Sequence, residues 1–293
     1  MKALFLVNAR SGSNRKRDIS ALIRASCDWE GYELTPCERK EDVDGIIERA
    51  LRDRFDVVFA VGGDGTAHEV AKRLIGTPLA LAVVPTGSGN GFARHIGFPL
   101  DPRKTIAACR DARVAAIDTA EVNGRPFIGI MGMGFDAFVA HRFDEQPARG
   151  LRTYVRTGLR GLTKFRAEDY EITVDGKQVR ERAIVVAIAN TAQYGNNARI
   201  APRASVLDGR LDVVILRRAT LLSVPLLVSR LFAGTLDASR AVGTHAASEI
   251  VIRREAEGDA HLDGEPVILP RDLHIRVRPQ SLHVLVPAGG GSI

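Results

Sequence analysis

The sequence lacks several features that mark whole classes of protein. None of its apolar runs approaches the roughly 18 residues that a membrane-spanning helix needs, and it contains no repeat or low-complexity tract. Its three cysteines are odd in number and lack the spacing of metal ligands, which predicts a reducing, cytoplasmic environment. Aromatic residues make up only 5% of the chain, whereas nucleic-acid binding favours basic clusters with interleaved aromatics. No nucleic-acid partner is therefore expected.

The composition that is present suits a globular protein with a basic surface. The chain has 293 residues, 45% of them hydrophobic and 26% charged, which is enough for one large or two ordinary domains. The net charge of +6 fits a plain solvated surface, but it also fits attraction to anionic membrane lipid or to nucleotide phosphates. The arginine-rich segment 142–166 has the same two interpretations, a membrane-facing amphipathic segment or a solvated helix face.

A strand, a glycine turn and a helix follow one another in the stretch 56–93. The apolar run 57–61 predicts a buried parallel strand, and apolar residues at helical spacing follow from Thr66. Between them stand Gly62, Gly63, Asp64 and Gly65. Glycines let backbone N–H groups close around an anion, and a helix N-terminus favours negative charge. This order predicts a phosphate-binding turn, with a simple tight turn as the alternative.

The same pattern repeats within about thirty residues, the spacing of a βαβ unit. A second apolar strand is predicted at 79–84, a second glycine-rich turn at 85–91, and a short helix from Phe92. Neighbouring parallel strands place such turns side by side at the carboxyl edge of the sheet, where open α/β sheets bind ligands. Two such turns, each after an apolar strand, favour phosphate binding over the alternative of simple tight turns.

The rest of the chain predicts an α/β domain followed by a β-rich domain. Before the first glycine turn, strands are expected at 2–7 and 32–37, and helices at 17–26 and 43–51. A helix at 105–110 and a strand at 114–119 follow the second turn. Short alternating segments then predict a sandwich or barrel. These segments are 120–122, 127–132, 170–174, 183–190, 211–216, 249–253, 273–277 and 282–286, interrupted by helical pieces at 151–165 and 221–232.

The predicted fold class is thus α/β plus β. An N-terminal α/β nucleotide-binding domain with a parallel sheet spans 1–119, and a β-sandwich substrate domain spans 120–293. Whether the last residues return to the first domain is left open. The active site is expected in a cleft between the domains, a favoured place for ligands.

Five motifs together resemble the diacylglycerol kinase catalytic-domain superfamily, which includes bacterial lipid kinases and sphingosine kinases. The GGDGT and PTGSGNGFAR stretches described above are joined by VNARSG at 7–12, LDGRLDV at 207–213 and LDGE at 262–265. The resemblance covers about residues 4–287 in the family's order. GGDGT alone is shared with NAD kinases, but the whole set is not.

The resemblance implies an ATP- and Mg²⁺-dependent kinase with an N-terminal fold like those of diacylglycerol and NAD kinases. It places a catalytic carboxylate at Asp64, which acts through Mg²⁺ or on the substrate hydroxyl, and a proton acceptor at Glu265 with Asp263 beside it. A hairpin turn is the plainer interpretation of Asp263 and Gly264, and both can hold. The implied nucleotide contacts are Asn8, Gly12, Gly63, Gly65, Thr66, Glu69, Gly87, Ser88, Gly89, Asn90 and Gly264.

The resemblance also implies metal and substrate contacts. A structural Mg²⁺ maps to Asp208 with backbone oxygens of Ser205 and Arg210, a donor set that suits a hard cation. Asp118 is placed in a Mg²⁺–water network, or else it merely begins a turn before Thr119. Asp136 is expected to face the head group of the acceptor. The histidines at 68, 95 and 141 are interpreted as structural.

The predicted function is transfer of the γ-phosphoryl group of ATP to a hydroxyl of a diacylglycerol-like or sphingoid membrane lipid. The enzyme would be cytoplasmic and would act transiently at the anionic inner face of the membrane, in lipid metabolism and phospholipid biosynthesis; a homodimer is left open. Asn90 is followed by Gly91, where many bacterial diacylglycerol kinases have Asp, which favours the sphingosine-kinase-like side. The alternatives are an NAD kinase-like enzyme with a soluble acceptor, and a nucleotide- or lipid-binding regulator with little catalysis.

Overall fold

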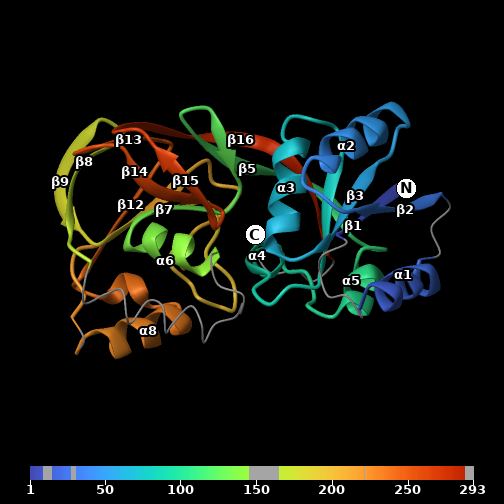
Figure 1. The fold of residues 1–293 in the computed structure, drawn as a ribbon, viewed down its shortest axis with the longest axis horizontal. Coiled ribbons are helices and arrows are strands. Elements are labelled where there is room, and N and C mark those ends of the chain that lie inside the picture. Colours follow the sequence, from blue (N-terminus) through green and yellow to red (C-terminus); the bar gives the residue numbers. More distant parts are fainter. Residues whose placement is uncertain (9–14, 28–30, 145–164, 221, 288–293) are drawn as a thin grey trace. The chain divides into compact units, whose positions relative to one another are not determined.

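The computed structural model describes residues 1–8, 15–27, 31–144, 165–220 and 222–287 (Figure 1). Backbone contacts divide the chain into two compact units. The first consists of Met1–Ile117 with Pro279–Ile293, and the second of Asp118–Arg278. The division falls close to the boundary predicted at residue 119, and the C-terminal residues count with the first unit. The cleft expected between the two domains stays a prediction.

The first unit is built on a parallel sheet in the order β2-β1-β3-β4. Its strands are β1 (Ala3–Asn8), β2 (Tyr32–Cys37), β3 (Val57–Gly62) and β4 (Ala80–Pro85). Its helices are α1 (Arg15–Ser26), α2 (Asp42–Arg52), α3 (Asp64–Leu74), α4 (Gly91–Ile96) and α5 (Pro102–Ala108). The strands β3 and β4 are buried along their whole length, because α1 with α5 and α2 with α3 cover opposite faces of the sheet (Figure 1).

Two long strands each replace a predicted pair of short ones. β5 (Arg113–Val122) joins the segments predicted at 114–119 and 120–122, and β16 (Asp272–Val286) joins those at 273–277 and 282–286. β16 pairs antiparallel with β13 through Asp272–Arg276 and parallel with β4 through His283 and Val284. The gap left between the two predicted segments is also strand, with Gln280 at a φ of 48°. The predicted interruptions are wrong because both strands continue past polar residues.

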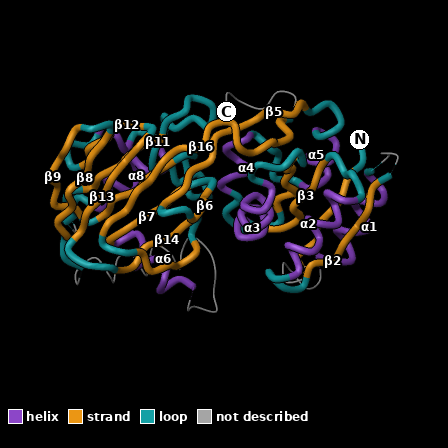
Figure 2. The backbone as a smooth tube through the Cα atoms, turned by 90° about the horizontal axis from the view of Figure 1, so that it is seen from above, coloured by secondary structure: helices purple, strands orange, loops and turns teal. Residues whose placement is uncertain are grey.

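The second unit is a β-sandwich with helices on one outer face. One sheet has the order β12-β11-β10-β7-β14-β15, and strands β13, β8 and β9 continue from β16 in the other, with β5 and β6 beside it. Tyr170 and Ile172 of β8 pack in one buried cluster with Val213 of β11, so the two sheets face each other (Figure 2). On the other side of the first of these sheets, Leu227 and Leu236 cover Val185 and its neighbours.

The elements of the second unit have the following bounds. Its strands after β5 are β6 (Arg125–Phe127), β7 (Ile130–Gly134), β8 (Glu168–Val174), β9 (Lys177–Ala183), β10 (Val185–Ala189), β11 (Leu211–Leu216), β12 (Val242–Ala247), β13 (Glu249–Arg254), β14 (Gly258–Leu262) and β15 (Glu265–Leu269). Its helices are α6 (Phe135–Asp144), α8 (Val224–Ala233) and the 3₁₀ turn η1 (Leu236–Ala238).

The expected fold class, an α/β domain with a parallel sheet followed by a β-sandwich, is confirmed. Details differ: the segment predicted at 127–132 divides between β6 and β7, and β9, β12, β14 and β15 were not predicted. β9 is mostly charged and exposed, so it lacks the apolar alternation by which strands are identified. The helix predicted at 151–165 lies outside the described residues, as does most of the arginine-rich segment 142–166.

Candidate functional site

The two glycine-rich turns of the first unit touch each other through their backbones. A Cβ atom built on Gly87 would lie 2.6 Å from the Cα of Gly63, a distance that backbone atoms cannot accommodate without moving. The amide of Thr86 donates a hydrogen bond of 2.8 Å to the carbonyl of Gly62. β3 and β4 end in register, with Gly62 beside Pro85, so both turns leave the carboxyl edge of the sheet together. Glycine at position 87 is therefore needed for this close approach.

The first turn leads directly into α3, which begins at Asp64 with Gly63 as its N-cap. The helix therefore starts earlier than the predicted Thr66, and Asp64 lies in its first turn, where the helix dipole favours a negative charge. The side-chain amide of Asn8, at the end of β1, donates to the Thr66 hydroxyl at 2.6 Å. A Cβ on Gly62 would lie 2.3 Å from that same hydroxyl oxygen. Asn8, Asp64 and Thr66 are thus brought together beside the glycines.

The second turn is shaped from within by Asn90. This residue is in the left-handed conformation, with a φ of 52°, and its buried side chain donates to the carbonyl of Gly87 at 2.8 Å. Arg94 of α4 donates to the carbonyl of Gly89 at 3.1 Å. Gly87 and Ser88 are exposed at the tip. The amide of Asn90 thus holds the turn that presents Ser88, and its contact with nucleotide stays a prediction.

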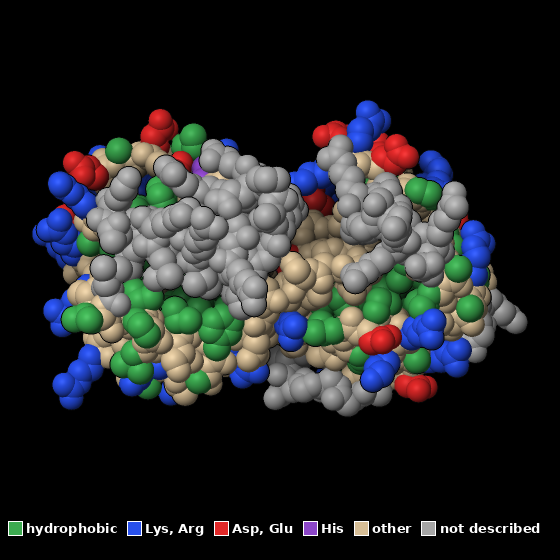
Figure 3. Space-filling model, turned by 60° about the horizontal axis from the view of Figure 1, so that its bottom comes forward, with side chains coloured by type: hydrophobic (Ala, Val, Ile, Leu, Met, Phe, Trp, Pro, Cys, Tyr) green, Lys and Arg blue, Asp and Glu red, His purple; other side chains and the backbone are tan. Residues whose placement is uncertain are grey.

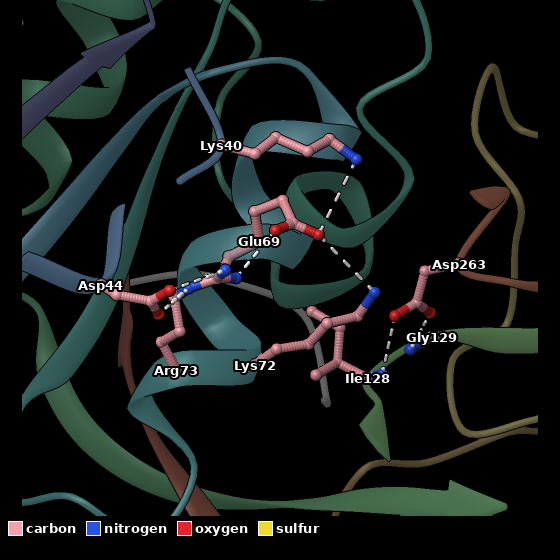
Figure 4. Close-up of polar contacts among 8 residues, drawn as sticks. All are labelled: Lys40, Asp44, Glu69, Lys72, Arg73, Ile128, Gly129 and Asp263. Carbon is pink, nitrogen blue, oxygen red and sulfur yellow. Dashed lines mark hydrogen bonds and ion pairs between the residues drawn. The ribbon is translucent and has the colours of Figure 1, made fainter. Parts of the chain in front are cut away.

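Glu69, a second predicted nucleotide contact, is engaged by three cationic side chains. Its carboxylate lies 2.7 Å from Arg73, 3.9 Å from Lys72 and 4.0 Å from Lys40, and its side chain is only 12% exposed (Figure 4). Arg73 also bonds Asp44, which ties α3 to α2. These contacts give Glu69 a structural role between two helices, and its contact with nucleotide stays a prediction. Gly12, a further predicted contact, lies outside the described residues.

In the second unit, Asp263 and Gly264 form the two-residue turn between β14 and β15, with φ values of 55° and 82°. The Asp263 carboxylate accepts hydrogen bonds from the backbone amides of Ile128, Gly129 and Ile130, at 3.0, 2.7 and 3.1 Å (Figure 4). Asp263 therefore anchors the turn, and its predicted catalytic role stays a prediction. Glu265 follows at the start of β15 and is half-buried.

Asp118 is a buried residue inside β5, so the expectation that it begins a turn is wrong. Its carboxylate accepts a hydrogen bond of 2.8 Å from the amide of Gly209, and its own amide donates to the carbonyl of Val206. Asp118 therefore holds the turn that contains Asp208. Nearby, burial and the charge of Asp208 raise the pKa of Asp212 to about 6.

The predicted cation site at this turn rests on one carboxylate and on backbone oxygens. Among the described residues, no group of three or more His, Cys, Asp or Glu side chains is arranged to hold a metal. Asp208 is exposed and accepts from the amide of Arg210, and Asp212 lies near enough for the two carboxylates to repel each other, an effect that Arg203 and Arg210 offset in part. Carboxylate and carbonyl oxygens fit Mg²⁺ in chemical type.

Asp136, the predicted substrate contact, is buried and has partners within its own unit. Its Oδ2 accepts from the hydroxyl of Tyr194 at 2.6 Å and lies 2.9 Å from Nε2 of His261. Gly132 of β7 leaves the room for this pair, because a Cβ there would lie 2.1 Å from Oδ2 of Asp136. The contact of Asp136 with an acceptor stays a prediction.

Sequence reasoning overlooked two buried polar residues of this unit. His261 stands two residues before Asp263 in HLDGE, and its nearness to that motif was the only signal available. Asn190 is fully buried and donates to the carbonyls of Asp118 and Ile128 at 2.9 and 2.8 Å, which links β5 to the segment held by Asp263. By contrast, His95 fits its structural interpretation, since burial lowers its pKa to about 4 and keeps it neutral.

Comparison with known proteins agrees with this arrangement. Residues 2–122 match the family model "Diacylglycerol kinase catalytic domain", and residues 129–286 match "YegS C-terminal NAD kinase beta sandwich-like domain". The chain belongs to the diacylglycerol kinase catalytic-domain superfamily. The resemblance drawn from the glycine motifs is confirmed, and with it the expectation that the chain is a kinase.

Relatives match over nearly the whole chain. A "Probable lipid kinase YegS-like" of Pseudomonas aeruginosa is 32% identical over 302 residues, covering 98% of this chain and 95% of the relative. A protein of the same description from Pectobacterium atrosepticum is 30% identical, covering 97% and 95%. Two crystal structures from Bacillus anthracis share the fold, the second of them titled as a diacylglycerol kinase. Their TM-scores are 0.81 and 0.75, at 19% and 18% identity, with 99% of this chain covered and 96% and 98% of theirs.

No helix in the described part of the chain is long and apolar enough to cross a membrane.

Proposed function

We propose that the protein is an ATP-dependent lipid kinase that phosphorylates a hydroxyl of a diacylglycerol-like or sphingoid lipid. The observation that carries the proposal is the pair of glycine turns held backbone to backbone at the carboxyl edge of a parallel sheet, one of them opening onto the N-terminus of α3. Backbone amides and a helix dipole at such an edge suit the phosphates of a nucleotide. The names of the relatives support a lipid as the acceptor.

The proposed site residues have two roles in phosphoryl transfer: some would bind the phosphates and the cation, and Glu265 would remove the proton. Thr66, with its hydroxyl held by Asn8, and the turn glycines would bind phosphate oxygens. Asp64, in the first turn of α3, would orient the acceptor hydroxyl or hold the cation, and Mg²⁺ when bound neutralises charge on the phosphates. Glu265 would accept the hydroxyl proton, from a backbone position fixed by Asp263.

An apolar and basic segment that leads into α8 supports action at a membrane. Leu222, just before the helix, and Leu226, within it, are 94% and 59% exposed. Between Asp212 and Asp237 the sequence has no acidic residue, but it has Arg217, Arg218 and Arg230. Figure 3, in which the bottom of Figure 1 comes forward, shows apolar side chains gathered on the second unit where α8 lies. Arg217 pairs with Glu181, but exposed leucines in a stretch that has arginines and no acidic residue suit an anionic lipid surface.

The deciding experiment measures transfer of labelled γ-phosphate from ATP to diacylglycerol, monoacylglycerol, sphingosine and ceramide in mixed micelles, with NAD as a soluble acceptor. Asp64→Asn is assayed beside the wild type, and we expect it to lower lipid labelling at least a hundredfold, since it removes a charge proposed to act in the transition state. Label on NAD alone would make the protein an NAD kinase-like enzyme. ATP binding with no label on any acceptor would favour a regulator.

A further inference from the structure

A buried polar network in the second unit has no part in the roles described so far. It consists of Tyr194, Asp136 and His261, which come from the segment after β10, the start of α6 and β14. The side chains of Asp136 and His261 are only 6% and 3% exposed. Buried polar groups of this kind are costly unless their hydrogen bonds are satisfied, so the arrangement of this network needs an explanation.

The hydrogen bonds determine which nitrogen of His261 carries the proton. The backbone amide of Gly264 donates to Nδ1 of His261 at 3.2 Å, so Nδ1 is the acceptor nitrogen of the ring. In a neutral imidazole the other nitrogen then bears the hydrogen. Nε2–H therefore points to Oδ2 of Asp136, 2.9 Å away, and the Tyr194 hydroxyl donates to the same oxygen. The ring is held from both sides in one orientation.

The network ends at the turn that precedes Glu265. Gly264 lies between Asp263 and Glu265, and its φ of 82° belongs to the tight turn between β14 and β15. The Asp263 carboxylate holds one side of this turn through the amides of 128–130. His261 holds the other side through the Gly264 amide. With both contacts made, the backbone that enters Glu265 has little freedom to move.

We propose that Tyr194, Asp136 and His261 are positioning residues that fix the Asp263–Gly264 turn and so place the carboxylate of Glu265. The consequence for catalysis rests on the proposed function, in which Glu265 accepts the hydroxyl proton. A general base must lie within hydrogen-bond reach of its proton, and a displacement of about 1 Å can lower a rate on the order of a hundredfold. The network therefore acts on turnover through the geometry of this turn.

Two substitutions of His261 separate its two hydrogen bonds. In His261→Asn, the side-chain oxygen can occupy the place of Nδ1 and accept from Gly264. In His261→Gln, the side-chain amide can occupy the place of Nε2 and donate to Asp136, but the acceptor for Gly264 is lost. We expect His261→Gln to lower kcat about tenfold or more with the KM for ATP unchanged, and His261→Asn to retain most of the activity. His274→Gln, at an exposed position of β16, is the matched control.

A readout independent of turnover is hydrogen exchange at the Gly264 amide, followed by NMR on the full chain. Exchange should be at least tenfold faster in His261→Gln than in wild type, and close to wild type in His261→Asn. Tyr194→Phe, which keeps the His261 contact with Gly264, provides a milder variant if the His261 variants fold poorly. It should lower kcat by a smaller factor than His261→Gln, again without a change in the KM for ATP.

Equal exchange of Gly264 in the Asn and Gln variants would overturn the proposal, as would an equal loss of kcat in both with Gly264 still protected. If the wild type phosphorylates no lipid, the proposed function fails, and exchange alone then decides whether His261 fixes the turn. Loss of protection in the Gln variant only would still support that part.

Discussion

At the scale of single residues, the glycines of the two turns differ in whether the structure leaves room for a side chain. Gly87 is constrained by the backbone of Gly63, whereas a Cβ on Gly65 would meet nothing within 4 Å. The sequence predicted both turns, because glycine clusters after apolar strands are a local signal. It could not predict that the turns press against each other, because that contact depends on the register of β3 with β4.

Gly87→Ala tests this close approach. The added methyl group would lie 2.6 Å from the Cα of Gly63, so the turns must separate and the phosphate-binding edge must change shape. We expect ATP binding to weaken at least tenfold and the melting temperature to fall by several degrees. Calorimetric titration with ATP and thermal unfolding measure both effects. Gly45→Ala, in an open position on α2, is the control and should keep the affinity and slightly raise stability.

Asp212 gives a prediction about pH. Its folded pKa of about 6 lies above the ordinary aspartate pKa of 3.8, so between these pH values the folded state holds a proton that the unfolded state has lost. Stability from this group is therefore full below about pH 4 and is lost as the pH rises to about 6. Asn cannot ionise, so Asp212→Asn avoids this loss of stability at higher pH. We expect the substitution to raise the free energy of unfolding at pH 7 by about 1 kcal/mol, a figure reduced for partial exposure.

Urea unfolding of wild type and Asp212→Asn at pH 4, 5, 6 and 7 measures this difference. The two curves should coincide near pH 4 and separate as the pH rises. A constant difference across the range would mean that the substitution acts through packing and not through the charge of Asp212. Added Mg²⁺ should narrow the gap at pH 7 by stabilising only the wild type, since a cation beside Asp208 offsets the repulsion.

At the scale of elements, prediction succeeded where the buried positions of a strand carry large apolar side chains and failed where they do not. β3 and β4 are buried throughout and were found, as was β13, which alternates in burial and has isoleucines at buried positions. β12 also alternates in burial, but it has few large apolar residues and was not found. The second unit is held together by pairing between strands distant in sequence, such as β7 with both β10 and β14. Such pairings have no local signal, and for the same reason the network of Asp136 and His261 could not be predicted.

The same limit explains why the contacts of two predicted site residues, Asp263 and Glu69, could not be foreseen. Asp263 was expected beside Glu265 as a chemical group, because both carboxylates stand in one short motif. The structure shows its carboxylate bound to amides more than 130 positions earlier in the chain. The short motif predicted a turn at this position. It could not show that the Asp263 carboxylate accepts hydrogen bonds from distant backbone amides. Glu69 was likewise identified by position, and its three cationic partners became visible only in the folded helix pair.

At the scale of the whole molecule, the proposed lipid acceptor requires a surface that meets the membrane. Leu222, just before α8, and Leu226, within it, are exposed to solvent in a stretch of sequence that has arginines and no acidic residue. Burying a leucine side chain is worth about 1.5–3 kcal/mol when complete, so two partly inserted leucines contribute enough to change membrane affinity about tenfold or more. The arginines add an attraction that salt weakens.

The double variant Leu222→Ser, Leu226→Ser should therefore bind vesicles of phosphatidylcholine and phosphatidylglycerol about tenfold more weakly than the wild type, in a flotation assay. Leu100→Ser, at a 40% exposed leucine of the first unit, should bind like the wild type. Activity on lipid in vesicles should fall with binding, while activity on a short-chain soluble analogue should not, because the substitutions leave the glycine turns and Glu265 unchanged. Unaltered vesicle binding in the double variant would assign membrane contact to another surface, and a loss on the soluble analogue as well would show that α8 supports the catalytic fold instead.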